Sequence, residues 1–208
     1  MIQLYRFKYS TNVERVALAL AHKKLPTESV WVDPEDRTAV RAVSGQDLVP
    51  TIVDVDRGRR VVYDSMVIVK YLEDAYPERA LYPADPARRV ETEIFIEWFN
   101  RVWKRPPNLI YDELQKTDPD RARIAAWGSE MAGWLPWFEA LLASRDYLMG
   151  PEFSAADVCA FPFLRYALTC EADDTHLFHD ILVEHMPLKG GFPKLSAWIR
   201  RVDTKPRA

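Results

Sequence analysis

The sequence predicts an α/β domain followed by an all-helical domain. Strand-like runs, with alternating or β-branched apolar residues, occur before Pro77 and not after it. A short proline-bounded segment follows, which is typical of a connector. Beyond that segment, apolar residues recur at helical spacing. We therefore expect an α/β domain at residues 1–77, a linker at 78–86 and a helical domain at 87–208.

Composition and charge narrow the possible partners. The 208-residue chain has 28 basic and 31 acidic residues, a net charge of −3, and no basic block, so nucleic acid is not expected. No apolar run reaches the ~18 residues of a membrane helix, and the start of the chain does not resemble a signal peptide. Cys159 and Cys170 have neither disulfide nor metal spacing, and we expect both to be buried. A cytoplasmic protein is predicted.

The first part of the chain reads as strand, helix, strand. Residues 2–7 alternate apolar and polar side chains, as a strand does. Thr11 and Glu14 fit a capping box, with Thr11 as the N-cap of a helix that continues to about Lys24. Residues 28–32 form the second predicted strand.

The remaining elements of this domain complete a recognisable order. A short helix is expected within residues 34–43, followed by a hairpin of residues 51–55 and 60–63. Asp64 and Ser65 open a helix that ends before Pro77. The order β-α-β-α-β-β-α, with a parallel pair, an antiparallel pair and a covering helix, is the thioredoxin-like arrangement.

The helical half reads as five segments. Residues 87–104 carry a broad apolar stripe, and Pro106 and Pro107 must kink or break that helix. We expect a second long helix with a kink at Pro136, and three further helices. The four segments after the first are residues 119–143, 154–170, 176–185 and 193–202.

The segment LVPTIVD at residues 48–54 combines a proline with a strand-like run. Pro50 has no N–H, so it belongs at the entrance of the strand. The proline ring pushes Val49 to an extended conformation. The backbone of Val49 could then pair with a peptide-like ligand as an added strand does. A plain loop leading into a strand is the alternative interpretation.

Four stretches together resemble the cytosolic glutathione transferases. They are STNVERVALAL (residues 10–20), LVPTIVD, YDSMVIVKYLED (63–74) and FSAADVCAFPFL (153–164). The second is similar to the loop in which this family has a cis-proline after valine. The third looks like the family's glutamate-serine motif with Asp64 in place of glutamate. The fourth is similar to its buried capping box, here Ser154 with Asp157.

The resemblance implies that glutathione binds to the first domain. Its γ-glutamyl carboxylate needs N–H donors, which a helix N-terminus supplies. Ser65 would add a hydroxyl, and Asp64 would accept a hydrogen bond from the ligand's amino group. The alternative is that either residue merely caps the helix. Gln46 is the candidate for the glycyl carboxylate, with Val49 and Pro50 on the ligand backbone.

The thiol end of glutathione needs one hydrogen-bond donor. A free thiol has a pKa near 8.5, so a donor that lowers it makes more of the nucleophilic thiolate at pH 7. Ser10 is the first candidate, because Thr11 is expected to be the N-cap; the reverse assignment is the alternative. Asn12 matches an asparagine of some bacterial relatives that can support or replace the hydroxyl. Tyr9 is the other donor to consider, since other classes use a tyrosine nearby.

Several features limit the class and the second site. No Cys-x-x-Cys, and no cysteine at all, lies near residues 9–13, so dithiol redox chemistry is not expected. Phe99, Val102 and Trp103 are candidates to line the pocket for the second substrate, although aromatic residues at this spacing are more often core. The histidines of the helical half do not form a metal pattern, and we expect solvated helix positions for His176, His179 and His185.

The leading interpretation is a metal-free glutathione transferase. It would use glutathione as co-substrate and transfer the thiolate to a small apolar electrophile, in detoxification, as a homodimer. One alternative is a glutathione-dependent isomerase of the maleylacetoacetate type, although the neighbours of Ser10 match that class poorly. The other is a non-catalytic relative that acts as a binding protein, which the presence of the whole set of site residues disfavours.

Overall fold

A computed structural model describes residues 1–208, and the chain divides into two compact units. The first unit is Met1–Ala84 together with Lys205–Ala208, and the second is Asp85–Thr204. No helix in either unit combines the length and the apolar character needed to span a membrane.

A four-stranded mixed sheet forms the centre of the first unit. Its strands are β1 (Ile2–Arg6), β2 (Thr27–Trp31), β3 (Thr51–Asp54) and β4 (Arg60–Tyr63), in the order β2-β1-β3-β4. β1 pairs in parallel with β2, whereas the β1–β3 and β3–β4 pairs are antiparallel. This topology confirms the predicted thioredoxin-like order of elements.

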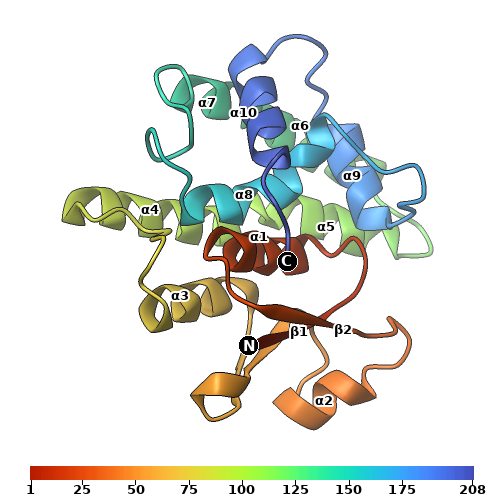
Figure 1. The fold of residues 1–208 in the computed structure, drawn as a ribbon. Helices are drawn as coiled ribbons and strands as arrows, with labels where there is room; N and C mark the ends of the chain where they lie inside the picture. The colour runs from red at the N-terminus through yellow and green to blue at the C-terminus, as the bar shows by residue number, and fades with distance from the viewer. The chain divides into compact units, whose positions relative to one another are not determined.

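Three helices accompany the sheet. α1 (Thr11–His22) lies on one side of it and α2 (Thr38–Ser44) on the other, and α1 packs along α3 (Ser65–Ala75) (Figure 1). The apolar positions of α1 recur at helical spacing and are buried, because they form the core between helix and sheet. A second small cluster of Tyr5, Val32, Val40 and Val53 is also buried, with Val49 packed against it.

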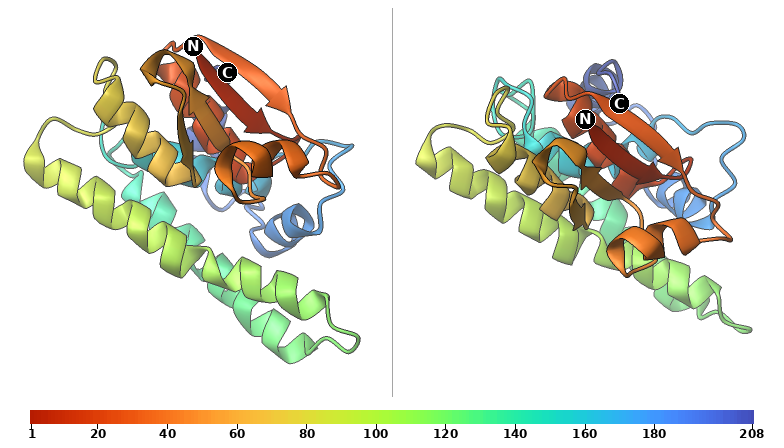
Figure 2. Two further views of the ribbon diagram at one scale, coloured as in Figure 1. Left: turned by 90° about the horizontal axis from the view of Figure 1, so that it is seen from below. Right: turned by 60° about the horizontal axis from the view of Figure 1, so that its bottom comes forward.

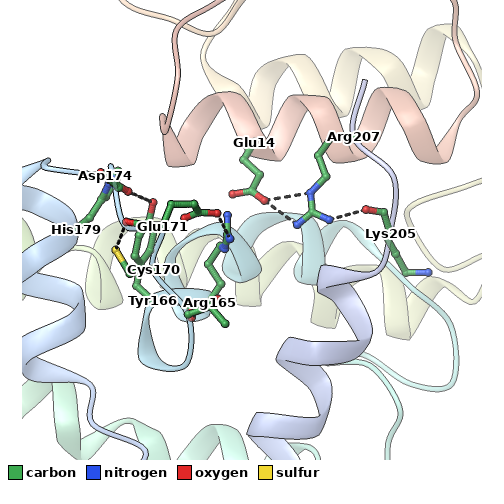
Figure 3. Close-up of polar contacts among 10 residues, drawn as sticks. Glu14, Arg165, Tyr166, Cys170, Glu171, Asp174, His179, Lys205 and Arg207 are labelled. Carbon is green, nitrogen blue, oxygen red and sulfur yellow. Dashed lines mark hydrogen bonds and ion pairs between the residues drawn. The ribbon is translucent and has the colours of Figure 1, made fainter.

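The last four residues belong to the first unit because they are bonded to α1. The guanidinium of Arg207 pairs with the Glu14 carboxylate at 2.8 Å (Figure 3). The backbone N–H of Ala208 donates to the carbonyl of Ala17 at 3.1 Å. These contacts connect the first and last elements of the unit.

The second unit is entirely helical, and its longest feature is a rod made by α4 and α5 with α6 beside it (Figure 2). The aromatic side chains of α4 and the segment after it form much of the core. The seven helices are α4 (Pro86–Trp98), α5 (Arg105–Leu114), α6 (Arg121–Gly133), α7 (Leu135–Leu141), α8 (Ala155–Leu164), α9 (Leu177–His185) and α10 (Pro193–Asp203).

Prolines determine where the long helices are interrupted. A π-helical turn, Phe99–Trp103, separates α4 from α5, and Pro106 and Pro107 lie in the first turn of α5. This confirms the predicted break. The single helix predicted over residues 119–143 is wrong, because the chain ends α6 at Gly133 and starts α7 with Pro136 in its first turn. A proline fits the first turn of a new helix, where no intrahelical N–H bond is required.

α8 begins at the predicted capping box. The Asp157 carboxylate accepts from the N–H and the hydroxyl of Ser154, at 2.9 and 2.8 Å. Its other oxygen accepts from the N–H of Leu148 and the indole N–H of Trp198. Asp157 is fully buried, so this one carboxylate joins α8, α10 and the preceding loop.

Candidate functional site

The loop before β3 has the predicted backbone geometry. The Val49–Pro50 peptide bond is cis, which confirms the prediction. Val49 lies outside the β1–β3 ladder, which ends at the pair Thr51 and Tyr5. Its side chain is half-buried against the valine cluster under the sheet, so packing holds the loop in position.

Gln46 holds this loop together from within. Its amide nitrogen lies 2.9 Å from the carbonyl of Leu48 and 3.0 Å from the hydroxyl of Thr51, and its amide oxygen accepts from the N–H of Leu48. A further contact joins the same nitrogen to Ser44. These bonds hold the Gln46 amide within the loop, and its predicted contact with a glycyl carboxylate stays a prediction.

The N-terminus of α3 carries the Asp64–Ser65 pair. Asp64 is the N-cap, and its Oδ1 accepts from the N–H groups of Met66 and Val67 at 3.0 and 3.2 Å. Both bonds use the same carboxylate oxygen, and Asp64 is exposed. Asp64 also has φ +68° and ψ 126°, a conformation that non-glycine residues rarely adopt.

The N-terminus of α1 differs from the prediction. Ser10 is the N-cap, since its hydroxyl oxygen accepts from the N–H of Val13 at 3.3 Å, and Thr11 is the first helical residue. Thr11 therefore lies inside the helix and is not the cap that the Thr11–Glu14 pattern predicted. A hydroxyl that accepts one hydrogen bond still has its own proton to donate. Capping therefore leaves Ser10 able to donate to a ligand sulfur.

The other two thiol-end candidates flank Ser10. Tyr9 lies in the turn after β1 with φ +61°, and the Lys8 ammonium sits over its ring at 4.5 Å. Asn12 is half-buried in the first turn of α1, and its Oδ1 accepts from Arg15 at 3.3 Å.

Arg15 is the site residue that the sequence analysis missed. Its Nη1 donates to Asn12 Oδ1 and, at 3.2 Å, to the hydroxyl oxygen of Ser65 on α3. The Ser65 hydroxyl lies 3.5 Å from Asn12 Oδ1, so the three side chains join the N-termini of α1 and α3. A sequence signal existed, because Arg15 is a charged residue immediately before the apolar run of residues 16–20. Without the position of α3, the sequence alone does not indicate which residue of another helix Arg15 contacts.

Comparison with known proteins identifies the family. The model of the glutathione S-transferase N-terminal domain matches residues 4–80, and the model of the C-terminal domain matches residues 121–201. The chain belongs to the glutathione S-transferase family. It is 31% identical to the glutathione S-transferase GstB of Escherichia coli (strain K12), over 79% of this chain and 82% of that protein.

Two further relatives extend this result. A maleylpyruvate isomerase from Ralstonia sp is 30% identical to this transferase-family chain, over 84% of it and 86% of the relative. The crystal structure of a glutathione S-transferase from Rhodospirillum rubrum F11 superposes with a TM-score of 0.75 at 27% identity. That match covers 99% of this chain and 89% of the other. The glutathione S-transferase fold, a small mixed-sheet domain plus a helical domain, is thus confirmed.

Trp103 does not line a pocket in this transferase-family protein. Its side chain is 1% exposed. It stacks on Phe99 with ring centroids 4.4 Å apart and meets the edge of Phe163 at 6.0 Å. The prediction that Trp103 binds the second substrate is corrected, because aromatic packing inside the helical unit encloses the ring. Val102, 40% exposed, is accessible instead.

A buried polar cluster occupies part of the helical unit. The Asp174 carboxylate accepts from Tyr166 at 2.9 Å and from Nδ1 of His179 at 2.7 Å (Figure 3). All three side chains are buried, so the expectation that His179 is a solvated helix residue is wrong. Burial lowers the pKa of His179, against the opposing effect of Asp174. Cys170 is exposed, which also corrects the expectation that both cysteines are buried, whereas Cys159 is buried as expected.

Proposed function

We propose that the protein is a glutathione transferase that activates the glutathione thiol and conjugates it to a small apolar electrophile. The observation that carries this proposal is the junction of two helix N-termini, joined by Asn12, Arg15 and Ser65, with hydroxyl groups on both helices. Helix N-termini favour anions, and glutathione has an anionic γ-glutamyl end and a thiol that ionises. The first unit would bind glutathione, and the helical unit would contact the second substrate.

The γ-glutamyl end is assigned to α3. The backbone N–H and the hydroxyl of Ser65 would bind the carboxylate, because the next two N–H groups donate to Asp64, and Oδ2 of Asp64 would accept from the ligand's ammonium group. The backbone of Val49 would pair with the backbone of the ligand's cysteine, as an added strand does. The position of Val49 just beyond the ladder supports this assignment.

The thiol end is assigned to Ser10. Its hydroxyl would donate to the sulfur while its oxygen keeps the bond from the N–H of Val13. A hydrogen bond to the thiolate, together with the dipole of α1, lowers the pKa of the bound thiol below ~8.5. A fall of one pKa unit corresponds to about 1.4 kcal/mol. Catalysis would then consist of thiolate stabilisation and proximity to the electrophile, without a metal.

Retention on immobilised glutathione, followed by turnover with a panel of apolar electrophiles, tests this proposal. A transferase is retained, is eluted by free glutathione, and consumes one glutathione for each conjugate. A protein that is not retained and does not convert any electrophile would contradict it. Retention without turnover would instead favour a non-catalytic binding protein.

A glutathione-dependent isomerase is the second candidate function. The similarity to a maleylpyruvate isomerase supports it. Glutathione would add to the substrate and then be expelled, so an isomerase would leave the glutathione concentration unchanged. Assay of free thiol during turnover of a cis-unsaturated diketo acid separates the two functions.

A further inference from the structure

The tail segment Lys205–Ala208 is bonded to α1, although it follows α10 in the sequence. Within it, Arg207 forms an ion pair with Glu14 of α1 (Figure 3). Nε and Nη2 of Arg207 both donate to Oε1 of Glu14, at 3.2 and 2.8 Å, and Nη1 donates to the carbonyl of Lys205. Three nitrogens of one guanidinium therefore fix its position relative to the carboxylate.

Glu14 is the acidic residue in the first turn of α1, one turn after the N-cap Ser10. The N–H of Glu14 donates to the carbonyl of Ser10 at 2.9 Å. Residues four positions apart on a helix lie on the same face, with their Cβ atoms about 5–6 Å from each other. The side chain of Glu14 is 16% exposed, so its charge is less screened than that of a surface carboxylate. A carboxylate thus lies close to the proposed position of the thiol.

A carboxylate in this position has two opposite effects. It stabilises α1, because negative charge in the first turn interacts favourably with the helix dipole. It also opposes a thiolate at Ser10, because a like charge nearby disfavours the ionised form. Arg207 from the tail and Arg6 from β1 both interact with the charge of Glu14, and Arg207 bonds to the carboxylate directly. The pair with Arg207 therefore reduces the second effect.

We propose that Arg207 is a positioning residue for thiol activation, because it offsets the charge of Glu14 that would otherwise oppose a thiolate at Ser10. The inference rests on the proposed function, in which Ser10 activates glutathione. It adds that a side chain 193 positions from Glu14 contributes to the electrostatic field at the N-terminus of α1. With Arg207 in place, α1 keeps its first-turn carboxylate while the thiolate stays favourable.

Substitutions of the two partners should move the pKa of bound glutathione in opposite directions. Arg207→Met removes the cation and leaves the charge of Glu14, so we expect the pKa of the bound thiol to rise by about 0.3–1 unit. The rate of conjugation below that pKa should then fall about two- to tenfold, and the rate well above it should be unchanged. Glu14→Gln leaves the charge of Arg207 and should lower the pKa. Arg207→Lys keeps the cation and should keep the pKa close to that of the unsubstituted protein.

The double variant separates an electrostatic role from a structural one. Glu14→Gln combined with Arg207→Met removes both charges, so the pKa should return nearly to that of the unsubstituted protein. An ion pair that only holds the tail in place would not give this return, because each substitution breaks the same contact. Arg59→Met is the matched control. Arg59 is an exposed arginine just before β4, in the same unit, and its loss changes the net charge equally but should leave the pKa nearly unchanged.

The pH profile of conjugation and titration of the thiolate absorbance of bound glutathione measure this pKa in variants that melting curves show to be folded. If the unsubstituted protein lowers the thiol pKa but Arg207→Met does not raise it, the role of Arg207 is overturned and the proposed function stands. The same holds if the double variant stays as far shifted as Arg207→Met, or if Arg207→Lys or Arg59→Met raises the pKa equally. If the unsubstituted protein does not bind glutathione or does not lower its thiol pKa, the proposed function itself fails, and the role of Arg207 fails with it.

Discussion

Ser10 shows how one side chain can serve a helix and a ligand together. Its oxygen accepts from the N–H of Val13, and its proton is available in another direction. The pattern Thr11–Glu14 looked like a capping box, but an adjacent serine and threonine can exchange the cap by a shift of one residue. The extended backbone angles of Ser10, φ −72° and ψ 113°, and the bond to its hydroxyl from the N–H of Val13 distinguish the two assignments. Gln46 raises the same ambiguity, because its side-chain amide can form hydrogen bonds with its own loop or with a ligand.

Substitution of Asp64 should have different effects on the stability of the protein and on glutathione binding. Its positive φ costs about 1–3 kcal/mol for a non-glycine residue, whereas exchange of a capping side chain for glycine costs only a few tenths. We therefore predict that Asp64→Gly leaves stability unchanged or raises it by about 1–2 kcal/mol, while glutathione binding weakens about tenfold or more. Urea unfolding and calorimetric titration measure the two effects. Loss of stability with unchanged affinity would show that Asp64 is only a cap.

At the scale of elements, α8 depends on one buried carboxylate. Asp157 accepts from four donors, and burial raises its pKa against the effect of these bonds. Asp157→Ala leaves those donors without a partner, so we predict a loss of at least about 3 kcal/mol in the free energy of unfolding. Glu152→Ala, an exposed acid in the same stretch, should cost less than about 0.5 kcal/mol. Equal unfolding midpoints for the two variants would refute this prediction.

The buried polar cluster between α8 and α9 should make the stability of the protein depend on pH. His179 has a pKa lowered from 6.5 by burial, so the unfolded chain takes up a proton at a higher pH than the folded chain. Protons then favour unfolding, and stability falls as the pH drops below 6.5. Burial alone would raise the pKa of Asp174, but hydrogen bonds from His179, Tyr166 and the N–H of His176 hold it below 3.8, which adds a loss of the same sign at lower pH.

His179→Gln tests this response, because it cannot take up the proton. We predict that the fall in urea midpoint between pH 7 and pH 5.5 becomes smaller in this variant than in the unsubstituted protein. Burial also lowers the pKa of His22, so part of the slope should remain. A slope that His179→Gln leaves unchanged would contradict this account.

At the scale of the whole molecule, periodicity predicts most of the fold. The sheet order and the division into two parts follow from alternation, apolar spacing and prolines, which are local signals. The contact of Arg15 with Ser65 depends on two helices 50 positions apart, and sequence alone gives no such distance. The same limit explains why the burial of Trp103 and of His179 could not be predicted from the sequence. Their burial depends on neighbours such as Phe163 and Asp174, which come from other segments.

The family resemblance implies a homodimer, and exposed apolar residues on α4 support it. Val90 and Ile94 lie one turn apart and are 53% and 64% exposed. We predict that light scattering gives the mass of two chains and that Ile94→Asp shifts the protein toward the mass of one chain. Glu93→Asp, a conservative change on the same helix, should leave the mass unchanged. A single-chain mass for the unsubstituted protein would contradict the prediction.

The most direct test of thiol activation is the pH dependence of conjugation in Ser10→Ala, with Tyr9→Phe and Asn12→Ala as comparisons. If Ser10 supplies about 1.4–2.7 kcal/mol, its loss raises the pKa of bound glutathione toward ~8.5 and lowers the rate at pH 7 about 10- to 100-fold. Glutathione affinity should change little in Ser10→Ala. Tyr9→Phe should leave the rate at pH 7 nearly unchanged. The contrary result is an unshifted pKa in Ser10→Ala together with loss of turnover in Tyr9→Phe or Asn12→Ala, which would assign the donor to one of those residues.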